Sequence, residues 1–96
     1  MYARVATYED ADAAAVRAAV EAVQAQGGPP EGVDSHAITV FTDPASGKVI
    51  VAGMFETREA LDRGHEALSA MEPPGGSFGR QVSVDLMEVP LSMSLG

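Results

Sequence analysis

The stretch that decides the fold is HAITVFTDPASGKVIVAGMF, residues 36–55. Its two halves, 36–42 and 49–55, are rich in β-branched and aromatic residues, which favour strands. Between them, Pro44 pre-sets one backbone angle and Gly47 tolerates a positive φ, a combination typical of a tight turn. The sequence therefore predicts a β-hairpin here.

A strand and a helix are predicted before this hairpin. Residues 2–8 mix aromatic, β-branched and small side chains, which suits a strand. The alanine-rich segment that runs to Gln26 has valines at i, i+4 and i+7 and is predicted to be an amphipathic helix. Asp10 or Asp12 is expected to cap its start, and the run Gly-Gly-Pro-Pro at 27–30 to end it.

A second helix and a last strand are predicted after the hairpin. Thr57 is expected to cap the helix, which ends before Pro73. The last strand covers about residues 80–89, and the apolar tail 90–96 follows it. The whole chain, 1–96, is therefore read as one domain, as its length requires.

The order β-α-β-β-α-β predicts an α+β, ferredoxin-like fold: a four-stranded antiparallel sheet with both helices on one face. Strands that are solvated on one face alternate apolar and polar residues, but 49–55 is apolar at odd and even positions alike. We therefore expect a second copy of the chain to cover the other face, giving a homodimer through the sheet, with the tail 90–96 contacting the partner. The alternative is that small residues on that face tolerate exposure.

Charge and composition exclude several classes of function. Fourteen acidic against six basic residues give a net charge of −8, so neither nucleic acid nor an anionic membrane is an expected partner. The absence of cysteine excludes disulfides, thiol catalysis and zinc fingers. No signal-peptide pattern opens the chain, so a cytoplasmic location is expected.

Residues 54–61, MFETREAL, join the hairpin to the second helix. This junction of a strand-end aromatic, an acidic residue, Thr and then Glu-Ala-Leu resembles that of antibiotic-biosynthesis-monooxygenase-like proteins in the dimeric α/β-barrel superfamily. The resemblance extends over nearly the whole chain. It implies a dimeric α/β barrel whose ligand pocket lies between the helices and the sheet. Other families of the same element order lack support, because the chain has no copper-binding cysteines, no basic stacking surface and no Gly-rich phosphate loop after the first strand.

The resemblance implies either a small enzyme or a protein without assigned activity. The superfamily's oxidising members tend to use Asn, Trp, Arg or His around the pocket, but this chain has no Asn and no Trp. Its haem-degrading members use a histidine late in the second helix, whereas His65 falls in the middle. No cofactor and no metal is therefore expected.

His65 is the candidate catalytic residue. It lies on the apolar face of the second helix, which would look at the sheet, and its ordinary pKa suits a general acid or base. The alternative is a histidine at the core edge that is hydrogen-bonded to a backbone carbonyl. The candidate apolar walls of a substrate site are Phe41, Met54, Phe55, Leu61 and Leu68.

Four further positions carry hypotheses. Arg4 would be a polar group of the pocket or the partner of a carboxylate across the dimer. Gly64 would leave room for a ligand or for close helix–sheet packing. His36, near Asp34, is expected at a surface strand end, because two ligands alone do not make a metal site. Residues 75–79 fit Gly-x-Ser-x-Gly but lack the strand–turn–helix context, so a loop with Phe78 as a plug is expected.

Three functions remain open from the sequence. The first is a cofactor-independent, monooxygenase-like or isomerase-like enzyme that acts on a small hydrophobic or aromatic substrate, with His65 as its acid or base. The second is a protein that binds such a ligand without converting it. The third is a structural dimer module with a filled interior.

Overall fold

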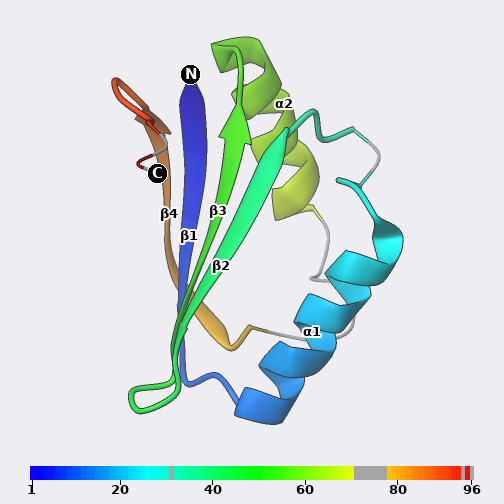
Figure 1. Cartoon of the computed structure of the whole chain (residues 1–96), viewed down its shortest axis with the longest axis vertical. Coiled ribbons are helices and arrows are strands. Elements are labelled where there is room, and N and C mark those ends of the chain that lie inside the picture. Colours follow the sequence, from blue (N-terminus) through cyan, green and yellow to red (C-terminus); the bar gives the residue numbers. More distant parts are fainter. Residues whose placement is uncertain (31, 71–77, 94, 96) are drawn as a thin grey trace.

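The predicted hairpin is present. In the computed structural model, β2 (Ala37–Asp43) pairs antiparallel with β3 (Lys48–Phe55), and Asp43 lies opposite Lys48 (Figure 1). The structure describes residues 1–30, 32–70, 78–93 and 95. The other elements are β1 (Tyr2–Glu9), α1 (Ala13–Gln26), α2 (Arg58–Ser69) and β4 (Arg80–Glu88).

The hairpin turn is held by Asp43. Its Oδ1 accepts a hydrogen bond from the backbone N–H of Ala45 (3.1 Å), and its Oδ2 accepts one from the hydroxyl of Ser46 (3.0 Å). The carbonyl of Asp43 also accepts from the N–H of Gly47, whose φ is +75°. An aspartate that bonds the backbone ahead of it and a glycine with a positive φ are the turn chemistry that the sequence predicts.

The sheet confirms the ferredoxin-like fold. Its four strands run in the order β2-β3-β1-β4, and every neighbouring pair is antiparallel. Both helices lie on the same side of this sheet (Figure 1). The central strands β1 and β3 thus form the floor beneath the helices.

Both helices begin at capping side chains. Asp12 Oδ2 accepts a hydrogen bond from the N–H of Ala15 (3.0 Å), so Asp12, and not Asp10, caps α1. Thr57 Oγ1 accepts from the N–H of Ala60 (3.1 Å), as predicted for α2. Each bond satisfies an N–H that has no partner within the helix.

The core consists of two apolar clusters on the helix-covered face. Under the N-terminal half of α1, the buried members are Val16, Ala19, Val49 and Phe78. Under α2, a second cluster contains Val33, Phe55, Ala60 and Leu61. Each helix therefore packs over its own part of the sheet.

Gly64 allows α2 to approach the sheet closely. A Cβ atom at this position would lie 2.6 Å and 2.8 Å from two ring carbons of Phe55. Phe55 itself is fully buried. The packing interpretation of Gly64 is therefore confirmed.

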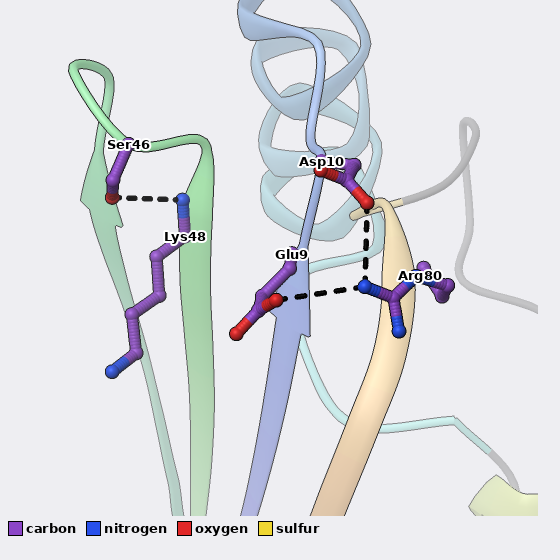
Figure 2. Close-up of polar contacts among 5 residues, drawn as sticks. All are labelled: Glu9, Asp10, Ser46, Lys48 and Arg80. Atoms are coloured by element: carbon purple, nitrogen blue, oxygen red, sulfur yellow. Dashed lines mark hydrogen bonds and ion pairs between the residues drawn. The ribbon is translucent and has the colours of Figure 1, made fainter.

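Polar contacts lie at the end of the sheet that holds the hairpin turn and the end of β1 (Figure 2). Arg80, at the start of β4, places Nη2 3.5 Å from Glu9 Oε1 and 3.4 Å from Asp10 Oδ2. In the hairpin turn, the Lys48 N–H donates to Ser46 Oγ (3.3 Å). Because the ion pairs are exposed, they contribute little to stability and mainly mark where β1 and β4 meet.

The second face of the sheet has no helix over it in the part of the chain that is described. Side chains alternate between the faces of a strand, so Phe41 and Met87 project from this uncovered face, where each is about half exposed (55% and 52%). In the tail, Leu91, Met93 and Leu95 are more exposed still. Apolar surface is therefore left open on one side of the molecule.

Candidate ligand-binding site

A cavity of about 740 Å³ lies between the helix-covered face of the sheet, the C-terminal ends of both helices and the loop 27–36. Its described lining residues from the strands are Arg4, Tyr8, Ala37, Ile38, Val51, Gly53, Phe55 and Gln81. The helices and loops contribute Val23, Gln24, Gln26, Gly27, Gly28, Pro29, Pro30, Val33, Ser35, His36, Leu68, Ser69, Phe78 and Gly79. The walls are mainly apolar, with a few polar groups among them.

The path of α1 creates this space. Val16 and Ala19, near its start, are buried against the sheet, whereas Val23 is only partly buried and lines the cavity. Figure 1 shows α1 running away from the sheet towards its C-terminal end. There Gly27, with φ of +72°, ends the helix. The helix and the sheet therefore form the two sides of a wedge.

Arg4 is the buried charged residue of the site. Only 7% of its surface is exposed, and it lines the cavity from the centre of β1. Its Nε donates a hydrogen bond to His65 Nδ1 on α2, 3.2 Å away. Burial lowers the pKa of the guanidinium, because desolvation penalises its charged form, and the nearby Tyr8 partly opposes this effect.

Arg4 has no carboxylate partner among the described residues, whose ion pairs involve Arg58, Arg63 and Arg80 instead. None of the described lining residues is acidic, although the chain has fourteen Asp and Glu residues. The described lining of the cavity therefore carries the positive charge of Arg4 in a negatively charged protein.

A second polar group, Tyr8, lies on the same strand and face as Arg4. Its hydroxyl accepts a hydrogen bond from Gln81 Nε2 on β4 (3.3 Å), so the phenolic proton remains available to another acceptor. The Tyr8 ring also packs against Phe78, with ring centroids 5.7 Å apart. Phe78 is 5% exposed and lines the cavity, so it is a wall of the core and not a plug at the surface. Residues 75–77 of the predicted loop lie outside the described residues.

His65 is placed beside the cavity but not in its wall. It is half-buried on α2, and its hydrogen bond is with Arg4 Nε, accepted at Nδ1, and not with a backbone carbonyl. The described lining includes Arg4 but not His65. Arg4 Nε carries the hydrogen of this contact, so His65 Nδ1 is the acceptor. Neither of the two interpretations that the sequence suggests describes this contact.

The structure divides the five predicted apolar walls. Phe55 and Leu68 line the cavity, and Leu61 is fully buried in the cluster beneath α2. Met54 and Phe41 lie on the uncovered face of the sheet, because Met54 adjoins Phe55 in a strand and Phe41 pairs with Ile50. Neither residue lines this cavity, and we leave both out of the ligand site proposed below.

His36 and Arg4 also have defined places. His36 is exposed at the mouth of the cavity, and its N–H donates to the carbonyl of Met54. No group of three or more metal-ligating side chains occurs in the described residues. Arg4 is on the helix-covered face, which corresponds to the pocket interpretation of this residue and separates it from the face expected to dimerise.

The loop 27–36 is the part of the site that sequence reasoning misses. Pro29, Pro30 and Ser35 of this loop form one side of the cavity, and the buried Val33 packs beneath α2. The signal was present in the length of this connection, which exceeds what is needed to join a helix to an adjacent strand.

Comparison of the chain with protein-family models, with curated proteins and with solved structures finds no match. Among the described residues, neither helix has the length and apolar character needed to cross a membrane. The site must therefore be interpreted from its own geometry and chemistry.

Proposed function

We propose that this protein binds a small, largely apolar molecule in the cavity between α1 and the sheet. The observation that supports this most directly is the cavity itself, whose volume of about 740 Å³ falls within the range of small-molecule sites, roughly 300–1,000 Å³. Mainly apolar walls with a few polar groups are also typical of such sites. A structural module with a filled interior would have no comparable space.

The proposed protein is a homodimer that associates through its uncovered sheet face, as in a dimeric α/β barrel. Phe41 and Met87 lie exposed on this face, and Leu91, Met93 and Leu95 lie exposed in the tail that follows β4. A second copy would supply both a matching apolar face and a tail to cover it. Since the cavity is on the opposite side of the sheet, each protomer keeps its own ligand site.

A cofactor-independent enzyme of the monooxygenase-like or isomerase-like kind is the second candidate. The observation that favours it is the contact of His65 with Arg4, which connects a titratable group to the cavity wall. His65 would then act through Arg4, because it does not itself line the cavity. Turnover of a bound compound that is lost in His65→Leu while binding is retained would support the enzyme over the binding protein.

The binding function is tested with Nile red, an uncharged apolar dye whose fluorescence rises in a dry site. Wild-type protein should bind it saturably, and Val23→Phe, which fills the cavity from α1, should weaken binding at least tenfold. The matched control is Ala18→Phe, which adds a similar ring to an exposed position of the same helix. The dimer face could also take up the dye, so a loss in Ala18→Phe as well, or no loss in Val23→Phe, would contradict the proposed site.

A further inference from the structure

We propose that the ligand of this cavity is an organic acid whose carboxylate pairs with Arg4, with an apolar body that occupies the rest of the space. This inference rests on the proposed binding function and names its ligand class. It is carried by the position of Arg4, which is buried and charged and lines a mainly apolar cavity.

Arg4 lacks a carboxylate counter-charge among the described residues. A buried charge is normally paired, because removing a charge from water is costly unless a partner replaces the lost hydration. Arg4 is more than nine-tenths buried, and no carboxylate among the described residues pairs with it. A ligand carboxylate would supply the missing charge.

The geometry of the Arg4 guanidinium also favours a carboxylate ligand. His65 occupies the Nε position of Arg4, which leaves the two Nη atoms. Among the described residues, no buried side-chain nitrogen is without a hydrogen-bond partner. The Nη atoms, for which the described residues provide no acceptor, are therefore not fully buried, and Arg4 lines the cavity. Two Nη groups side by side match the two oxygens of a carboxylate.

The charge of the described cavity lining differs from that of the whole protein. The protein carries a net charge of −8, yet the described cavity lining has no acidic residue. Among the described lining residues, the charge that an acid inside the cavity would meet at close range is the positive charge of Arg4. Since interactions between charges strengthen in a low-dielectric site, Arg4 would outweigh the more distant and solvent-screened surface carboxylates.

The space beside Arg4 suits the apolar body of the ligand. Arg4 and Tyr8 lie on the same face of β1, four residues apart, which corresponds to roughly 13 Å along a strand. On the neighbouring strand β3, Gly53 lies opposite Arg4, and Val51 lies opposite the fully buried Ala6; both β3 residues line the cavity. An acid with a medium-length alkyl chain or an aromatic ring fits this space, with the Tyr8 hydroxyl available to a second polar group.

His65 is a positioning residue in this scheme. Its Nδ1 accepts from Nε of Arg4 and fixes the plane of the guanidinium. This contact directs the Nη atoms without requiring His65 to touch the ligand. The role is distinct from that of a general acid or base.

The test compares octanoate with octan-1-ol, which has the same chain length but no charge, by calorimetry at pH 7.5. Wild-type protein should bind octanoate at least tenfold more tightly than octan-1-ol. Arg4→Met should abolish this preference while leaving octan-1-ol binding within about twofold, since one charge-assisted contact is lost. Arg63→Met is the matched control: it removes an exposed cation of α2 that lies outside this cavity and should keep the preference.

The His65 role is tested in the same assay. His65→Leu should reduce the preference for octanoate, and His65→Gln, whose amide oxygen can accept from Nε, should restore most of it. Equal loss of octan-1-ol binding in His65→Leu would indicate a structural role instead. Circular dichroism confirms that each variant is folded.

The outcomes separate this inference from the proposed function. If Nile red and octan-1-ol bind but octanoate has no advantage, or if its advantage survives Arg4→Met, the acid inference is wrong and the binding function stands. If no compound binds in the cavity, the proposed function itself fails.

Discussion

Arg4 and His65, which are 61 positions apart in the chain, are joined by a hydrogen bond of 3.2 Å from Nε to Nδ1. The bond connects the central strand β1 to α2. It also orients the buried cation of the cavity through a group that does not line the cavity. This contact between a strand and a helix orients the cation of the proposed site. The spacing of Arg4 and His65 in the sequence does not reveal it.

Arg4→Met should not destabilise the ligand-free protein. The variant removes a buried cation that has no carboxylate partner among the described residues, and this gain offsets the lost hydrogen bond to His65, about 1.5–3 kcal/mol for a charged donor. Because burial lowers the pKa of Arg4 in the folded state, its charged form opposes folding at neutral pH. Urea unfolding at pH 7 should therefore give a free energy equal to or above that of the wild type. A loss of more than about 2 kcal/mol would mean that Arg4 is already compensated within the fold.

Gly64→Ala should lower the free energy of unfolding by about 1–3 kcal/mol, because the added methyl group would collide with the buried ring of Phe55. Gly28→Ala serves as the control, since a Cβ there meets nothing within 4 Å. Chemical denaturation of both variants gives the comparison. Adding Phe55→Leu to Gly64→Ala should recover part of the loss; a Gly64→Ala protein as stable as the wild type would refute the close packing.

Thr57→Ala should destabilise the protein by about 1 kcal/mol, because the N–H of Ala60 loses the hydroxyl that caps α2. Thr57→Ser keeps a hydroxyl at the same position and should stay close to the wild type. The thermal midpoints of the three proteins measure the effect. Equal losses in both variants would point to packing of the threonine methyl group and not to the cap.

Phe41→Asp should convert the proposed dimer into a monomer, because it would bury a carboxylate in the middle of the sheet-to-sheet interface. Sedimentation equilibrium over a hundredfold concentration range measures this change. Ala18→Asp, on the exposed side of α1, adds the same charge and should leave the dimer intact. A wild-type protein that sediments as a monomer throughout the range would disprove the dimer.

The fold is predictable from sequence because its signals are local. The turn residues Asp43 and Gly47, the cap at Thr57 and the glycine–proline run after α1 each act within a few neighbouring residues. The choice between Asp10 and Asp12 as a cap could not be made from the sequence, because both are suitable residue types. The structure assigns a φ of +60° to Asp10 and a capping bond to Asp12.

The site is less predictable because it depends on which face each strand turns to the helices. Met54 and Phe55 are equally apolar neighbours, yet only Phe55 lines the cavity. Composition cannot decide between them, whereas the alternation of strand side chains can, once one residue is placed. The space itself results from the angle between α1 and the sheet. No single residue of that helix indicates this angle in the sequence.

The angle between α1 and the sheet also means that the two ends of the proposed site select the ligand in different ways. At the Arg4 end, strand backbones and a hydrogen bond fix the recognition of charge. At the other end, the width is set by how far α1 stands from the sheet, with Val23 as the described apolar contact from that helix. In a homologous series of acids, affinity should therefore change gradually with chain length, while replacing the carboxylate by an uncharged headgroup should lower it at least tenfold. A site built in this way is strict about chemical class and tolerant of size.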